Sequence, residues 1–195
     1  MTRIALIRHG ATFWNAEGRI QGHADTPLSP EGRAELARLA PPPELRGGTW
    51  FSSPLARAVE TARLLGHEPQ IEPLLIETNW GAWEGLTRAV TTPLSHRIAA
   101  RGLAGLDFRP PGGESPRAAQ DRLCRFFADL ERNGPDFAVC VTHKGIIRAA
   151  LSLALGWDMR DKPPFKLKWR AAHIFVWESG HLRLETANLA LPARA

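Results

Sequence analysis

Short apolar runs alternate with amphipathic helical patterns along most of this 195-residue sequence, and this alternation constrains the fold more than any other feature. The apolar runs predict strands over 3–7, 49–53 and 136–143, and a terminal hairpin over 171–188. The patterns between them predict helices over 26–40, 54–69, 112–135 and 144–156. Strands that alternate with helices favour an α/β fold, here a three-layer α/β/α sandwich around a mostly parallel central sheet.

Local signals mark several boundaries of these elements. Ser29 can cap the helix over 26–40, with Pro30 in its first turn, and Gly66 can end the next helix. The terminal hairpin is expected to turn at Ser179 and Gly180. Periodicity is weak over 84–114, where we expect a helix followed by a mobile excursion, a candidate lid. The length, and the lack of a low-complexity linker, favour a single domain over 1–195.

The basic residues are dispersed rather than clustered. The sequence holds 21 arginines and four lysines and has a net charge of +5, yet no run of five basic residues occurs. A nucleic-acid-binding protein would concentrate such charge on one stripe or patch. We therefore expect no nucleic acid as a partner, and a small anionic ligand instead.

The sequence shows no sign of a membrane or secretory segment. No apolar run is long enough to cross a bilayer, and "MTRIALIRHG" at the N-terminus lacks the apolar core of a signal peptide. Cys124 and Cys140 lie in apolar segments and form no CxxC pair, a pattern typical of reduced core thiols. These features predict a cytoplasmic protein with no membrane partner. The sequence leaves open whether the chain forms a homodimer.

Polar side chains follow three of the predicted strands. The first strand runs into Arg8 and His9, the second leads into a helix whose first turn holds Arg57, and the third ends at His143. In an open α/β sheet ligands bind beyond the carboxyl ends of the strands, so neighbouring strands would bring these side chains together. Such a cluster of cations is unfavourable without an anion. A phosphoryl group fits, because guanidinium groups bind its oxygens in pairs and helix N-termini add donors.

Six blocks of sequence carry a family resemblance. They are "LIRHGATFWNAEGRIQG", "DTPLSPEGRAEL", "FSSPLARAVETA", "ETNWGAWEGLT", "PGGES" and "VTHKGIIRA", in this order along most of the chain. With these blocks the sequence resembles the histidine phosphatase superfamily, the group that includes cofactor-dependent phosphoglycerate mutases. The resemblance implies a phosphoglycerate mutase-like fold. It also implies that His9 is the nucleophile that becomes phosphorylated, and that Glu77 protonates the leaving oxygen. The implied phosphoryl-binding residues are Arg8, Arg57, His143 and Asn15.

The chemistry of these residue types agrees with the implied roles. A neutral imidazole can attack phosphorus when its other nitrogen holds the proton. Phosphoryl transfer depends mainly on positioning and on stabilisation of charge, which arginines and a second histidine supply. A carboxyl group in a partly apolar setting can hold a proton near neutral pH, and Trp80 and Trp83 could provide that setting for Glu77. Glu84 is a rival acid in the same segment.

Three further positions are candidate substrate contacts. Gln21 and Gly22 can contact the ligand or only form a turn. Lys144 departs from the resembled family, whose members commonly have glycine after the second histidine. It can bind a second anionic group of the substrate or pair with Glu114. The remaining histidines show no metal-ligand spacing, so neither a metal nor another cofactor is expected.

The preferred interpretation is a metal-independent hydrolase of a small phosphomonoester, acting through a phosphohistidine at His9 that water attacks with Glu77 as base. Two alternatives within the resembled family are phosphoglycerate mutase-type transfer and the phosphatase of α-ribazole phosphate. The chain is short between the acid and the "GES" block, which favours hydrolysis over mutase activity. The alternative from outside the enzymes is a non-catalytic module that only binds phosphorylated ligands.

Overall fold

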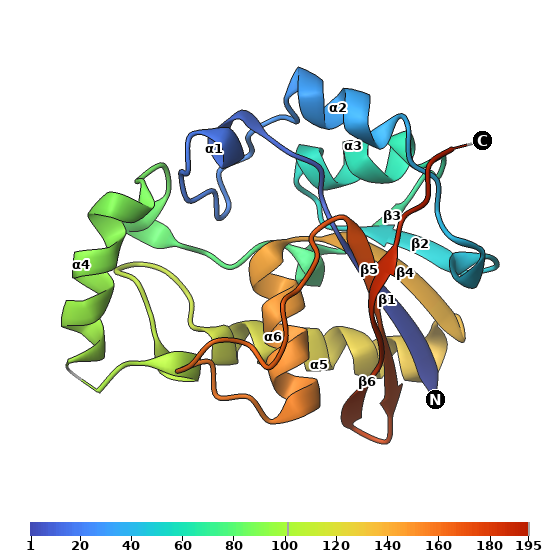
Figure 1. Ribbon diagram of the computed structural model, residues 1–195. Coiled ribbons are helices and arrows are strands. Elements are labelled where there is room, and N and C mark those ends of the chain that lie inside the picture. Colours follow the sequence, from blue (N-terminus) through green and yellow to red (C-terminus); the bar gives the residue numbers. More distant parts are fainter. Residues whose placement is uncertain (101, 195) are drawn as a thin grey trace.

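Six strands form one mixed sheet in the order β3-β2-β4-β1-β5-β6, and the computed structural model describes residues 1–100 and 102–194 (Figure 1). The strands are β1 Thr2–Arg8, β2 Thr49–Ser52, β3 Gln70–Ile71, β4 Phe137–Thr142, β5 Ala171–Glu178 and β6 His181–Ala190. Strands β1 to β4 pair in parallel, whereas β5 runs antiparallel to both β1 and β6. The sheet is therefore mostly parallel, as the alternating sequence pattern predicts.

Helices cover both faces of this sheet. They are α1 Phe13–Ala16, α2 Pro30–Leu36, α3 Ala56–Leu64, α4 Arg88–Ala99, α5 Pro116–Asn133 and α6 Lys144–Leu155. Figure 1 shows α2 and α3 on one side and α5 and α6 on the other, while α4 stands away from the sheet. Short 3₁₀ helices lie at Pro43–Leu45, Pro73–Leu75, Gly81–Trp83 and Gly105–Asp107.

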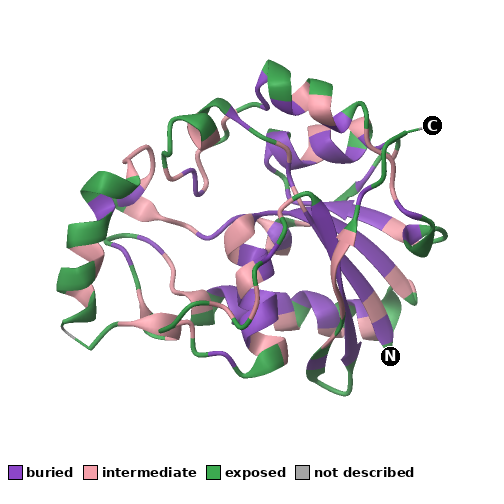
Figure 2. Cartoon of the chain, viewed as in Figure 1, coloured by how far each residue is buried: buried purple, intermediate pink, exposed green. Residues whose placement is uncertain are grey.

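The central strands are buried on both faces, which explains their continuous apolar runs (Figure 2). Ile4 and Leu6 of β1 belong to the core cluster under α5 and α6. Ala5 and Ile7 belong to the cluster under α2 and α3. The predicted three-layer sandwich is thus confirmed, because alternate residues of one strand supply two separate cores.

The predicted boundaries hold in most places. Ser29 caps α2 by accepting a hydrogen bond from the Gly32 N–H, but the helix ends at Leu36, short of the predicted residue 40. The hairpin turns at Ser179 and Gly180, which have φ angles of 50° and 81°. Positive φ at both positions matches the twist of the flanking strands. None of the described helices is long and apolar enough to cross a membrane.

The segment 84–114 contains the predicted helix, α4, and then a chain segment tied to its surroundings. Asp107 forms an ion pair with Arg117 at 2.7 Å, and the Ala82 N–H donates to the Pro111 carbonyl over 2.9 Å. Residue 101 of this segment lies outside the described residues. Mobility and a lid function of the excursion after α4 therefore stay predictions.

Candidate active site

The carboxyl ends of β1, β4 and β2 lie side by side, because β4 pairs in parallel with both of the other strands. His9 follows β1 and donates its backbone N–H to the Thr142 carbonyl over 2.9 Å. His143 follows β4 and is the N-cap residue of α6. The ring centroids of the two histidines are 5.1 Å apart. The sheet therefore brings together the two histidines that the sequence places at separate strand ends.

His9 is held as a neutral imidazole with one nitrogen available. Its Nδ1 lies 2.7 Å from the Gly10 carbonyl, which can only accept a hydrogen bond, so Nδ1 carries the proton. The lone pair is then on Nε2. Burial, followed by the charges of Arg8 and Arg57, holds the pKa of His9 well below its usual value. Near neutral pH the ring is therefore uncharged, and the lone pair on Nε2 is available.

Arg57 is completely buried in the first turn of α3. Its two terminal nitrogens donate to the carbonyls of Ala24, over 2.7 Å, and Gly22, over 2.8 Å. Burial lowers the pKa of Arg57, and the Glu77 carboxylate opposes that effect. These contacts use the Gly22 carbonyl to orient the arginine, so Gly22 supports the site through its backbone.

His143 is also fully buried, and its Nε2 lies 2.7 Å from Ser53 Oγ, just beyond β2. Burial lowers its pKa far below the usual value, with smaller contributions from His9 and Arg57. Within residues 1–100 and 102–194, the Nδ1 of His143 and the Nε atoms of Arg8 and Arg57 are buried without a hydrogen-bond partner. Unsatisfied buried nitrogens are costly. Oxygens of a bound anion would satisfy them.

Glu77 reaches the same place from the segment after the 3₁₀ helix Pro73–Leu75. Its carboxylate accepts hydrogen bonds from the backbone N–H groups of Thr78, over 2.8 Å, and Gly145, over 3.2 Å. Only 8% of Glu77 is exposed. A Cβ on Gly145 would lie 2.4 Å from Glu77 Oε1, so glycine is needed there for the carboxylate to fit. Glu77 thus sits at the N-terminus of α6, next to His143.

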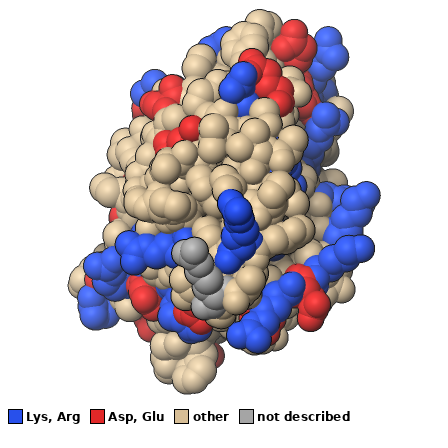
Figure 3. Space-filling view, turned by 90° about the vertical axis from the view of Figure 1, so that its left-hand side faces the viewer, with Lys and Arg blue, Asp and Glu red and all other residues tan. Residues whose placement is uncertain are grey.

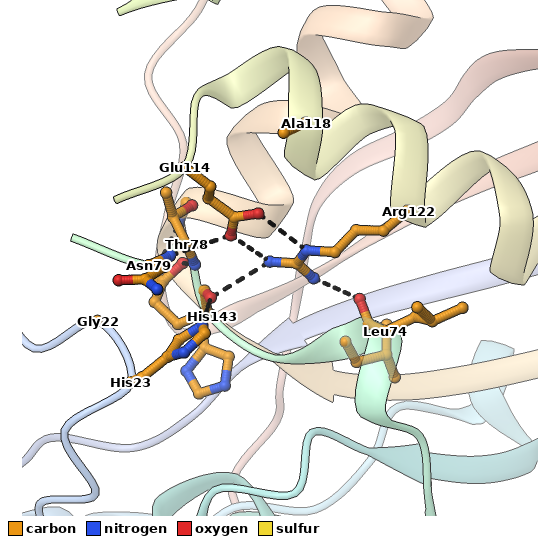
Figure 4. A network of polar contacts seen from close by, with 12 residues as sticks. Gly22, His23, Leu74, Thr78, Asn79, Glu114, Ala118, Arg122 and His143 are labelled. Carbon is orange, nitrogen blue, oxygen red and sulfur yellow. Dashed lines mark hydrogen bonds and ion pairs between the residues drawn. The ribbon is translucent and has the colours of Figure 1, made fainter. Parts of the chain in front are cut away.

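A polar network holds the backbone of Glu77 in place (Figure 4). Arg122 of α5 donates to the Glu77 carbonyl over 3.2 Å and also to the Leu74 carbonyl. Its guanidinium forms an ion pair with Glu114 at 2.8 Å, and Glu114 in turn accepts the Asn79 N–H over 3.0 Å. Figure 4 shows the Arg122 side chain reaching from α5 toward these groups, which lie on a neighbouring segment.

His23 completes this network from the opposite side, with its Nε2 2.9 Å from the same Glu77 carbonyl. Sequence reasoning missed both Arg122 and His23 as residues of the site. For Arg122 a signal exists, because it lies four residues before Phe126, on the buried face of α5. An arginine on a core-facing position is buried only with partners. His23 carries no comparable signal.

A family model described as histidine phosphatase superfamily (branch 1) matches residues 4–190. The chain belongs to the histidine phosphatase superfamily. The chain is 31% identical to the glucosyl-3-phosphoglycerate phosphatase of Mycolicibacterium vanbaalenii over 198 residues, 94% of this chain and 86% of that protein. It is also 37% identical to a bifunctional protein of Mycobacterium tuberculosis over 120 residues. This aligned stretch is 58% of the present chain and 33% of that protein. The chain therefore spans about a third of that relative's length.

Solved structures of the superfamily share the fold described above. A phosphoglycerate mutase from Thermus thermophilus superposes with a TM-score of 0.73 at 38% identity, over 98% of this chain and 100% of that one. A mycobacterial glucosyl-3-phosphoglycerate phosphatase complexed with VO3 superposes with a TM-score of 0.78 at 28% identity. This superposition covers 97% of the present chain and 100% of that one. The chain thus resembles members named as phosphatases and members named as mutases.

Glu84, the rival acid considered from the sequence, is occupied by backbone donors. Its carboxylate accepts the N–H groups of His23, over 2.7 Å, and Ala24, over 2.8 Å. Gly22 has a φ of 58°, and a Cβ there would lie 2.0 Å from Glu84 Oε1. Glu84 therefore fixes the loop that orients Arg57. Trp80 and Trp83, expected around Glu77, stack on each other with their ring centroids 6.2 Å apart.

Asn15 lies in α1, the short helix after His9, and Gln21 lies on the loop that follows this helix. Asn15 lines a cavity of about 280 Å³ together with Arg8 and His9. Its side chain also accepts the Thr12 N–H over 3.1 Å in the capping box of α1. Gln21 is buried and donates to Thr12 Oγ1 over 2.5 Å. Asn15 therefore lies at the cavity wall and Gln21 is hydrogen-bonded to Thr12, while a ligand contact stays a prediction for both.

Lys144 does not pair with Glu114, the partner considered from the sequence, because that carboxylate is bound by Arg122 and by the Asn79 N–H. The Lys144 Nζ lies instead 5.1 Å from the ring centroid of Trp169. Trp169 also lines the cavity beside His9. Lys144 thus lies at the edge of the candidate active site.

Proposed function

We propose that this chain hydrolyses a small phosphomonoester through a phosphohistidine intermediate at His9. The observation that carries the proposal is the set of three unpartnered buried nitrogens, on Arg8, Arg57 and His143, around a neutral histidine with an available Nε2. A phosphoryl group offers three oxygens to such donors, and its charge offsets the cost of burying two guanidinium groups. Similarity to members named as phosphatases supports the same reaction class.

In the first step the Nε2 lone pair of His9 forms a bond to phosphorus while the ester P–O bond breaks. The leaving oxygen takes a proton from the carboxyl group of Glu77, so the alcohol departs uncharged and Glu77 becomes a carboxylate. The guanidinium groups of Arg8 and Arg57, with the ring of His143, stabilise the charge on the phosphoryl oxygens. The Gly10 carbonyl stabilises the Nδ1–H while Nε2 reacts.

In the second step a water oxygen attacks phosphorus and the P–Nε2 bond breaks. The Glu77 carboxylate accepts the proton of that water, which regenerates the acid for the next cycle. Orthophosphate leaves and His9 returns to its neutral form. Phosphoglycerate mutase-type transfer would differ only here, because the phosphoryl group would return to a bound alcohol instead of passing to water.

The surface charge gives no support to a nucleic-acid-binding function. Figure 3 shows Lys and Arg side chains mainly along the lower part and one side of the face that it presents, with Asp and Glu among them. Many of the arginines are also paired, as in the ion pairs of Arg33 with Glu60 and of Arg63 with Glu68. A phosphate-backbone contact surface would gather unpaired cations along one groove.

Brief incubation with a ³²P-labelled phosphomonoester tests the proposal. We expect an acid-labile, alkali-stable protein adduct that His9→Ala abolishes and that His96→Ala, a change at an exposed position, leaves intact. Release of orthophosphate in the absence of any second alcohol distinguishes hydrolysis from mutase activity. Activity should survive treatment with EDTA. An adduct that persists in His9→Ala would overturn the assignment.

A further inference from the structure

The buried hydroxyl of Thr61 joins the turn that follows His9 to the helix that carries Arg57. Its Oγ1 accepts the Gly10 N–H over 2.9 Å and donates to the Arg57 carbonyl over 2.7 Å. Thr61 lies in α3, about one helical turn after Arg57, and none of its surface is exposed. One side chain therefore connects the end of β1 to α3 next to the proposed nucleophile.

Both contacts of the Thr61 hydroxyl have a defined direction. The Arg57 carbonyl can only accept a hydrogen bond, so the hydroxyl proton points to it. The Gly10 N–H can only donate, so it is bound by a lone pair of the same oxygen. A bond to the carbonyl four residues earlier is common for a threonine in a helix and implies no further role. The bond to Gly10, which is 51 positions away in the chain, is the contact that needs an explanation.

Gly10 passes this restraint on to the imidazole of His9. Its carbonyl lies 2.7 Å from His9 Nδ1 and keeps the proton there, which leaves the lone pair on Nε2. Its N–H is held by Thr61, and a Cβ on Gly10 would lie 2.5 Å from Leu36 Cδ1 of α2. Gly10 is thus confined between α2 and α3. A shift of its backbone would change the direction of the imidazole and the nitrogen that carries the proton.

The segment around Arg57 contacts both histidines of the candidate site. Ser53, Arg57 and Thr61 follow one another at intervals of four residues, and none of the three is exposed. Ser53 Oγ lies 2.7 Å from His143 Nε2, and Thr61 holds the Gly10 N–H beside His9. The guanidinium that would bind the phosphoryl group therefore belongs to the same rigid segment as the groups that fix the two rings.

We propose that Thr61 is a positioning residue, which sets the direction of the His9 ring relative to Arg57 and so aligns Nε2 with the phosphorus atom. This inference rests on the proposed hydrolysis at His9 and adds a residue that acts through Gly10 rather than on the substrate. Phosphoryl transfer depends mainly on alignment, and a displacement of about 1 Å can cost about a hundredfold in rate. Without the hydroxyl, the Gly10 N–H would lose its partner, and the turn would shift toward another acceptor.

A pair of variants at Thr61 tests this role. Thr61→Val keeps the shape of the side chain and removes the hydroxyl, whereas Thr61→Ser keeps the hydroxyl. In rapid-quench measurements we expect Thr61→Val to slow phosphohistidine formation by about tenfold to a hundredfold, and Thr61→Ser to stay within about threefold of wild type. Wild-type rates in Thr61→Val, or equal losses in both variants, would overturn the proposal.

Ser152→Ala is the matched control, because it also removes a buried hydroxyl. Ser152 accepts the Gln120 Nε2–H over 3.1 Å and donates to the Trp157 carbonyl, near the end of α6 that is remote from His143. This variant should lower the melting temperature and leave the rate of phosphohistidine formation unchanged. A loss of rate as large as that of Thr61→Val would show that general destabilisation explains both.

Two inorganic anions separate alignment from binding. Orthophosphate requires only the charged donors, whereas vanadate can also bond to Nε2 in a five-coordinate form that resembles the transition state. As inhibitors, vanadate should bind about tenfold to a hundredfold more weakly to Thr61→Val than to wild type, and orthophosphate should change by less than about threefold. Equal weakening of both anions would indicate a merely structural role and contradict the proposal.

Nitrogen-15 NMR of the His9 ring separates failure of this inference from failure of the proposed function, because it needs no turnover. The His9 signals are assigned by comparison with His9→Ala. We expect the Nδ1–H tautomer in wild type and in Thr61→Ser, and a mixture of tautomers in Thr61→Val. That result would support the positioning role even if no ester were hydrolysed. Ring signals in Thr61→Val identical to those of wild type would overturn it, whether or not the protein is a phosphatase.

Discussion

Gly145 lies directly against Glu77: a Cβ on Gly145 would sit 2.4 Å from Glu77 Oε1, while the Gly145 N–H donates to Oε2 over 3.2 Å. The same residue therefore leaves room for the carboxylate and holds it. Gly145 is the second residue of α6, directly after Lys144 and His143. The first turn of this helix thus positions the proposed general acid and the second active-site histidine together.

Gly145→Ala should displace the Glu77 carboxylate without removing it. A shift of about 1 Å in a catalytic group can cost about a hundredfold in rate, so we expect kcat to fall by roughly tenfold to a hundredfold. KM for a simple alkyl phosphate should change little, because the phosphoryl ligands stay in place. Stopped assays of phosphate release measure both constants. Wild-type kcat in this variant would show that the carboxylate position does not limit the reaction.

Glu77→Gln tests the acid itself against its rival. Turnover of an alkyl phosphate should fall by about 10²–10⁴-fold, the range for a lost general acid. The loss should be smaller for p-nitrophenyl phosphate, whose leaving group needs little protonation. Glu84→Gln is the matched comparison: it weakens the contacts to His23 and Ala24, so it should lower the melting temperature and affect both substrates alike. A larger leaving-group dependence in Glu84→Gln would mean that the acid is misassigned.

Arg122 should act on catalysis through the position of Glu77, because it donates to the Glu77 carbonyl. Arg122→Lys keeps the charge but loses the forked geometry that joins Glu114 to two carbonyls. We expect kcat to fall more for alkyl phosphates than for p-nitrophenyl phosphate, with KM nearly unchanged. A merely structural role would lower the melting temperature and reduce both activities equally.

The sequence predicted the residues at the strand ends but not what holds them. His9, Arg57 and His143 could be located because buried strands, and the first turn of the helix that follows β2, fix where their backbones emerge. Arg122 and His23 contact a backbone carbonyl, which has no residue identity and so leaves no pattern. The partner of Lys144 was also beyond sequence reasoning, since Glu114 and Trp169 are each far from it in the chain. Strand β3, with two residues, is too short for periodicity to reveal.

His173, in the buried strand β5, should make the protein less stable in mild acid. Burial lowers its pKa to about 4, whereas an unfolded histidine titrates near 6.5. Between these values the unfolded chain binds more protons than the folded one, so the free energy of unfolding falls as pH drops below about 6.5. Urea unfolding at several pH values measures this. His173→Asn, which keeps an acceptor for the Asn188 N–H, should flatten that slope by up to about 1.4 kcal/mol per pH unit. An unchanged slope would show that His173 does not titrate on unfolding.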